Sequence, residues 1–265
     1  MKKLIRKRYI QVIIIMIIFV GIAFLIYKNL TRYNLSEIEE LRLHNGKYNL
    51  EQLQKYTVNG EQTTLSEDDI AIVEANITEE SNIIKMINKV YNWEKEYFKY
   101  ERAGGAFVGK RTVSDIFDDK ILTGCHDYGI VFSSILRHYG ISAVMVDTAG
   151  IKWANKYQNE KTRDFSGHVF VEIYYEDSCF LFDPTFGKLI IDYDPNNPII
   201  PTTFYILDSE GFYVIAKGID PLDYGVSSID ILKKRMIEFA QEIQEIDIVI
   251  PKYKVASINN IDFNK

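Results

Sequence analysis

The chain has 265 residues and a formal net charge of −6 at pH 7, from 31 basic and 37 acidic side chains. This acidic balance argues against binding of nucleic acid or of anionic lipid headgroups. Apolar residues make up 47% of the chain and aromatic residues 13%, so the sequence can build one domain with a sizeable core.

The N-terminal residues predict a membrane anchor. A basic tail, residues 1–8, precedes an apolar run over residues 9–27 in which only Gln11 is plainly polar. Such a run is just long enough to cross a bilayer core of about 30 Å at about 1.5 Å per residue. The positive charge ahead of it predicts a cytoplasmic N-terminus and an extracellular remainder. A cleavable signal peptide is the alternative, but the run ends in bulky rather than small residues.

The sequence beyond the apolar run divides into two parts. Residues 28–77 are rich in Glu, Asn, Gln and Thr, with short apolar interruptions, and predict an extracellular stalk or linker. The domain is predicted over residues 78–265. Its first helix is expected from Ile83 to about Tyr100, capped within residues 78–81, and a short capped helix is expected around residues 111–117.

One cysteine has the setting of a nucleophile. Cys125 begins an apolar helical run that ends before Gly140, so it is expected at a helix N-terminus. The unpaired N–H groups and the positive dipole end there favour thiolate, and the N–H of Cys125 can donate to an oxyanion. Asp127 is interpreted as a first-turn helix carboxylate rather than a catalytic one. Because a buried cysteine is usually a small core residue, the interpretation depends on its partners.

The chain offers only four histidines as a base. His126 is next to Cys125, and adjacent helical residues point about 100° apart, so it is not expected to share a proton with the sulfur. His138 is expected about 20 Å further along the same helix. His44 lies in the polar stretch near the membrane. By elimination, His168 is the predicted base.

A predicted hairpin brings a carboxylate to His168. Residues 168–175 and 179–183 are each typical of a strand, with Glu176–Asp177 between them as a two-residue turn. In that register His168 and Asp183 are diagonal neighbours on one face, about 7–8 Å apart at the backbone, which their side chains can bridge. A three-residue turn would place them on opposite faces. The triad hypothesis therefore predicts the turn.

The second cysteine bears on the same hypothesis. Cys179 is expected on the same face as Asp183 but about 13 Å along the strand. A Cys125 that reaches His168 and Asp183 cannot also bridge to Cys179. Paired cysteines are common in exported domains, so a disulfide stays open as a lower-ranked alternative.

The remaining pattern indicates an α+β fold. A strand is expected over residues 141–148, then a polar excursion over 149–166 in which Trp153 and Tyr157 either line a groove or pack on the domain. Further strands are expected within residues 204–217 and an amphipathic closing helix over 228–243. Helices followed by mainly sequential strands indicate α+β architecture.

These motifs resemble the bacterial and archaeal transglutaminase-like domains, over roughly residues 83–185. The resemblance implies a papain-like α+β core, with N-terminal helices packed on an antiparallel sheet. It also implies the roles of nucleophile for Cys125, base for His168 and orienting carboxylate for Asp183. His126 departs from the family pattern and is interpreted as tolerated at an exposed helix start, or as tuning the thiolate. The resemblance rests on Arg111–Thr112, Thr123–Tyr128, Leu136–Arg137, Gly140–Ile141, Gly167–Glu172 and Asp183–Thr185.

The sequence thus predicts a membrane-anchored, extracellular cysteine enzyme that acts on amide bonds of peptides or proteins, such as cell-wall or surface substrates. Water as acceptor gives a peptidase or amidase, and an amine gives a transglutaminase. The alternative is a non-catalytic binding module on the same fold. A metal site built from residues 125–127 and His168 matches no zinc spacing, so no metal and no cofactor are expected. The oligomeric state is left open.

Overall fold

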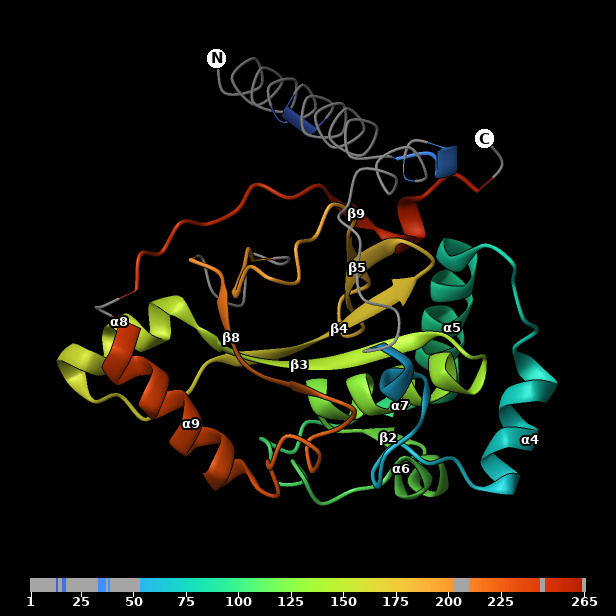
Figure 1. The fold of residues 1–265 in the computed structure, drawn as a ribbon, viewed down its shortest axis with the longest axis horizontal. Helices are drawn as coiled ribbons and strands as arrows, with labels where there is room; N and C mark the ends of the chain where they lie inside the picture. The colour runs from blue at the N-terminus through green and yellow to red at the C-terminus, as the bar shows by residue number, and fades with distance from the viewer. Residues whose placement is uncertain are drawn as a thin grey trace, which may run out of the picture.

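A seven-stranded antiparallel sheet organises the computed structural model, which describes residues 13, 16, 17, 33–36, 38, 53–202, 210–243 and 246–263. The strands lie in the order β7-β8-β3-β4-β5-β6-β9 (Figure 1). A separate two-stranded parallel sheet joins β1 (Lys99–Tyr100) to β2 (Ile121–Leu122). The strands of the large sheet are β3 (Ser142–Gly150), β4 (Gly167–Tyr175), β5 (Ser178–Asp183), β6 (Lys188–Ile190), β7 (Ile199–Ile200), β8 (Phe212–Gly218) and β9 (Val255–Ser257).

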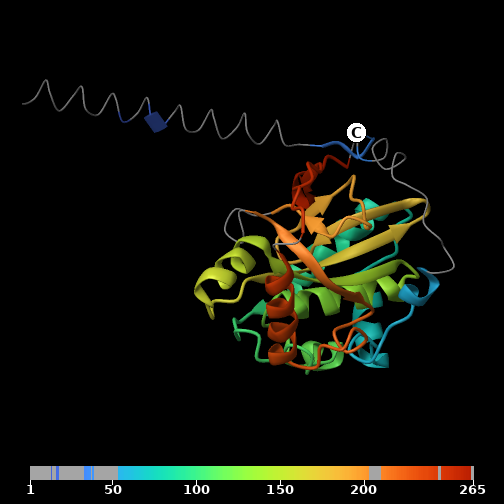
Figure 2. The same ribbon diagram turned by 60° about the vertical axis from the view of Figure 1, so that its left-hand side comes forward.

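The helices form two groups around this sheet. In the first, α7 packs on β3 and β4 and is flanked by α5 and α6; in the second, α8 and α9 pack together near β3 (Figures 1 and 2). The helices are α4 (Glu67–Asn76), α5 (Ile83–Tyr97), α6 (Val113–Asp119), α7 (Cys125–His138), α8 (Ile151–Glu160) and α9 (Ile229–Glu242), with short 3-10 turns η1 (Gln54–Thr57) and η3 (Ile258–Asn260).

The main core lies between α7 and the sheet. Phe132 of α7 stacks on Phe182 of β5, with ring centroids 4.8 Å apart. Tyr91 of α5 meets the same Phe182 edge to face at 5.7 Å. Such aromatic pairs add to the free energy of area burial. The packing therefore holds α7 firmly against the strands that carry the predicted histidine and aspartate.

The hairpin between β4 and β5 has the predicted register. Tyr175 pairs with Ser178, and Val171 pairs with Phe182. Glu176 has φ +51°, the left-handed conformation that tight hairpin turns require. The two-residue turn is therefore confirmed, and the parity of the strand places residues 168 and 183 on one face.

The sequence missed two ordered regions. Residues 53–77, predicted as part of the stalk, pack on the domain: Val73 and Ile77 are fully buried in the main core, as is Ile38. Ser66 caps α4 through a capping box. The polar excursion over 149–166 contains α8, because its few apolar side chains share one buried face. Helix α5 is capped by Asn82 rather than within residues 78–81.

The predicted membrane span lies almost wholly outside the described residues. Of residues 9–27, the structure describes Ile13, Met16 and Ile17 alone. Within the described part of the chain, no helix is both long and apolar enough to cross a membrane.

The cap of α6 can be tested by mutation. Thr112 accepts a hydrogen bond from the backbone N–H of Asp115, whose carboxylate accepts from the N–H of Thr112. Thr112→Ala is expected to lower the free energy of unfolding by about 1 kcal/mol, measured by urea denaturation. Glu96→Ala, at an exposed position of α5, is the control and is expected to stay within about 0.5 kcal/mol of the parent. Equal effects of the two changes would contradict a stabilising cap.

Candidate active site

Cys125 lines a pocket of about 430 Å³. As the first residue of α7, it lies at the positive end of the helix dipole. The same pocket is lined by His126 of α7, by Asp147 and Thr148 of β3, and by His168 of β4.

His168 and Asp183 meet as predicted. Nε2 of His168 lies 3.0 Å from Oδ1 of Asp183, and both side chains are buried. At this distance the imidazolium and the carboxylate form a buried ion pair. The imidazole is packed among Phe170, Phe186 and Phe212, with centroid distances of 4.9, 5.6 and 5.9 Å. The aromatic shell fixes the ring, and Nδ1 is left for the sulfur.

Backbone groups hold the Asp183 carboxylate in place. Its Oδ1 accepts the N–H groups of Thr185 and Phe186 at 3.0 and 3.1 Å. Lys95 of α5 donates to the carbonyl of Thr185 at 2.8 Å and lies over the ring of Tyr128, 3.8 Å from its centroid. The turn after β5 is thus fixed to α5 and α7, and the carboxylate is oriented before any substrate binds.

His126 is not where the sequence placed it. We expected a side chain tolerated at an exposed helix start, or one that tunes the thiolate; the residue is buried. Its Nε2 lies 2.9 Å from Oδ2 of Asp147 on β3, and the hydroxyl of Tyr224 donates to the same oxygen at 2.8 Å. His126 and Cys125 line the same pocket. The expected exposure of His126 is therefore wrong, and the site holds a second imidazole–carboxylate pair.

The two imidazoles control the thiol. Burial alone would raise the pKa of Cys125, but hydrogen bonds from His126 and His168 and their charges lower it to about 6. Burial alone would lower the pKa of His168, yet the Asp183 carboxylate and the thiolate raise it to about 10. The pKa of His126 is likewise raised well above its ordinary value by Asp147, against the effect of burial. Between about pH 6 and 10 the pair is thiolate and imidazolium.

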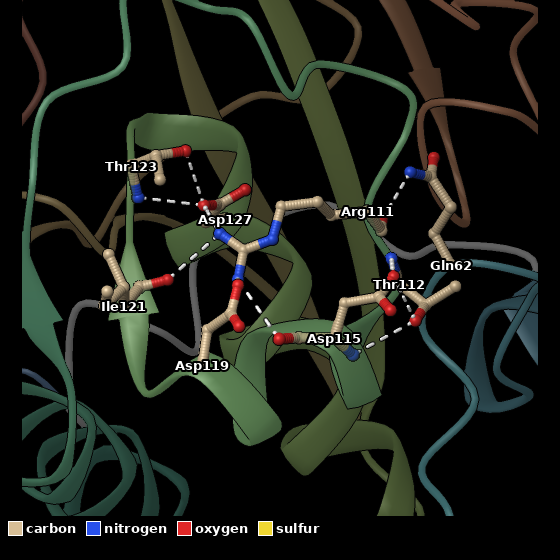
Figure 3. Close-up of polar contacts among 8 residues, drawn as sticks. All are labelled: Gln62, Arg111, Thr112, Asp115, Asp119, Ile121, Thr123 and Asp127. Carbon is tan, nitrogen blue, oxygen red and sulfur yellow. Dashed lines mark hydrogen bonds and ion pairs between the residues drawn. The ribbon is translucent and has the colours of Figure 1, made fainter.

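A buried arginine holds the start of α7 (Figure 3). Nη1 of Arg111 lies 3.0 Å from Oδ2 of Asp127 and 3.1 Å from the carbonyl of Ile121. Thr123 donates to the same carboxylate oxygen from its backbone N–H and its hydroxyl, at 2.8 and 2.7 Å. Nη2 of Arg111 reaches Asp119 at 3.1 Å. Asp127 is thus a structural carboxylate that fixes the residues on both sides of Cys125.

Other candidates lie away from the thiol. His138, at the far end of α7, has Nε2 3.1 Å from Oε1 of Glu74, and His44 lies outside the described residues. Both cysteines belong to the described part of the chain, and neither forms a disulfide. Cys179 is buried on the same face of β5 as Asp183, four residues along the strand from it. Among the residues that the structure describes, no group of three potential ligands is placed to hold a metal.

The outer wall of the pocket is apolar, with cations. Trp153 and Tyr157, which we expected either at a groove or packed on the domain, pack in the cluster between α8 and α9. Phe165, which the sequence did not single out, lines the pocket instead. The basic side chains of this wall are Arg102, Arg163 and Lys233. Its apolar side chains are Val108 and three residues of α9, Ile229, Leu232 and Met236.

One protein-family model matches part of the chain. Residues 71–184 match the family model of the transglutaminase-like superfamily, a stretch that includes Cys125, His168 and Asp183. No curated protein matches the chain. The chain is similar to a solved structure described as "a Putative Cysteine Protease from Cytophaga hutchinsonii", with 14% identity and a TM-score of 0.46. That similarity covers 66% of this chain and 50% of the other, so the chain spans about half the length of that protein. The family match supports a transglutaminase-like α+β core over residues 71–184.

Proposed function

We propose that the protein is a cysteine enzyme that cleaves or exchanges amide bonds, with Cys125 as nucleophile, His168 as acid and base and Asp183 as orienting carboxylate. The observation that carries the proposal is the buried His168–Asp183 pair, 3.0 Å apart, beside a thiol whose pKa is lowered to about 6. A structural cysteine in an apolar site has its pKa raised instead. Cys179 behaves that way, because burial raises its pKa well above the ordinary value.

The reaction follows from these groups. The Cys125 thiolate attacks the amide carbonyl carbon, and a C–S bond forms. His168 gives its proton to the nitrogen as the C–N bond breaks, which leaves a thioester and a free amine. Water or another amine then attacks the thioester with His168 as base, and the thiolate leaves. Because the thiolate is one cause of the raised pKa of His168, its consumption makes the imidazolium a better proton donor.

The substrate class follows from the pocket and the predicted topology. A wall of apolar side chains with three cations can hold a peptide that carries apolar and acidic groups next to the reacting amide. We further propose that residues 9–27 anchor the protein and leave the domain outside the cell, where peptides of the wall or surface are within reach. The support for this is the apolar run over residues 9–27 of the sequence, in which only Gln11 is plainly polar.

The test is acyl transfer by the full-length chain in detergent. It would be incubated with glutamine-bearing peptides and a primary amine, with intact mass used to detect thioester, hydrolysed peptide and amine adduct. We expect a thioester with the parent chain and none with Cys125→Ala. Hydrolysis identifies a peptidase or amidase, and adduct formation identifies a transferase. A reactive thiol without any acyl product over a peptide panel would overturn the enzyme proposal and favour a binding module.

A further inference from the structure

We propose that His126, held by Asp147 and Tyr224, is a second catalytic histidine, which stabilises the Cys125 thiolate and keeps its own proton throughout the cycle. This rests on the proposed function, because it assigns a role at the same thiol. The triad alone leaves the pair formed by His126 and Asp147 without a use.

The geometry of Asp147 suits a permanently charged partner. Its carboxylate lies on β3, where it is 1% exposed, and its Oδ2 accepts from both His126 Nε2 at 2.9 Å and the Tyr224 hydroxyl at 2.8 Å. A carboxylate that accepts hydrogen bonds from an imidazole and a hydroxyl favours the imidazolium form of its histidine partner. With Nε2 engaged by Asp147, Nδ1 is the ring nitrogen left for the sulfur of Cys125.

The other charged groups near the ring do not compete for this role. His126 faces Cys125 of its own helix and Asp147 of β3, and the pocket adds His168 of β4. Tyr224, in the loop before α9, is kept neutral because burial raises its pKa well above its ordinary value. The carboxylate of Asp127, the next residue of α7, is already paired with the Arg111 guanidinium and accepts two hydrogen bonds from Thr123. Asp220 lies near Tyr224 and accepts the backbone N–H of Gln62.

The two histidines differ in the surroundings of their carboxylates. Oδ2 of Asp147 accepts the Tyr224 hydroxyl as well as His126 Nε2, whereas Oδ1 of Asp183, 3.0 Å from His168 Nε2, accepts the backbone N–H groups of Thr185 and Phe186. The proposed function already uses His168 as the proton donor to the leaving amine. His126 neither gains nor loses a proton in any step; it holds the thiolate before attack and again when the thioester is resolved.

The test is the pH dependence of Cys125 alkylation by iodoacetamide in the full-length chain, followed by peptide mass. The parent is expected to show a midpoint of about 6. His126→Gln is expected to move the midpoint upward, toward about 8.5 for a free thiol. Asp147→Asn, which does not touch the sulfur, is expected to move it in the same direction. His138→Gln, on the same helix but paired with Glu74, is the matched control and is expected to leave it unchanged.

The outcomes separate this inference from the proposed function. An unchanged midpoint in His126→Gln overturns the role of His126, even if amide cleavage by the parent is observed. A raised midpoint without any acyl product from the parent leaves the role intact and removes the enzyme. If His126→Gln does not fold, Asp147→Asn decides, since an unchanged midpoint there overturns the inference equally.

Discussion

A His168→Gln variant is expected to lose about 10²- to 10⁴-fold in kcat/KM for amide cleavage, the contribution of a positioned general acid and base. Glutamine cannot carry the proton that the leaving nitrogen needs. The thiol should nevertheless keep part of its reactivity, because His126 still contacts Cys125. We therefore expect turnover to fall much further than iodoacetamide alkylation at pH 7.

Two measurements on the same variant check this separation. Single-turnover acylation, read by intact mass, reports proton delivery, and the alkylation rate reports thiolate. Asp183→Asn should lose less than His168→Gln, since the amide oxygen can still accept the N–H groups of Thr185 and Phe186 that hold residue 183 in place. If His168→Gln kept full turnover while His126→Gln lost it, the roles of the two histidines would be reversed.

The placement of His168 and Asp183 could be predicted because it depends on short-range order. A strand has a period of two, and one two-residue turn fixes which residues share a face. The observed pairing of Tyr175 with Ser178 sets the same parity as the prediction. The start of α7 was equally local, because a run of apolar residues at helical spacing begins at Cys125.

The role of His126 could not be predicted from the helix alone. The angle between adjacent side chains on a helix excludes direct overlap, but it does not say what packs against the helix. Asp147 accounts for the difference, because β3 brings it to 2.9 Å from the ring. The available signal was a carboxylate in an otherwise apolar strand, since a buried charge needs a partner. Residues 53–77 were missed for a related reason: isolated apolar side chains such as Val73 become core only when α4 packs on the domain.

Arg111→Met is expected to lower the free energy of unfolding by about 3–5 kcal/mol, the cost of removing one partner of a buried ion pair. Arg111 and Asp127 have side chains only 7% and 4% exposed and lie 3.0 Å apart. Methionine fills much of the volume but leaves the Asp127 carboxylate buried with donors from Thr123 alone. Urea denaturation of the full-length chain would measure the change.

Two controls separate the buried pair from the surface contact of the same arginine. Asp119, the other acidic partner of Arg111, is 64% exposed, so Asp119→Asn is expected to cost less than about 1 kcal/mol. Adding Asp127→Asn to Arg111→Met should recover part of the loss, because the uncompensated buried charge is then gone. Similar costs for Arg111→Met and Asp119→Asn would contradict the view that the buried Arg111–Asp127 pair fixes the start of the nucleophile helix.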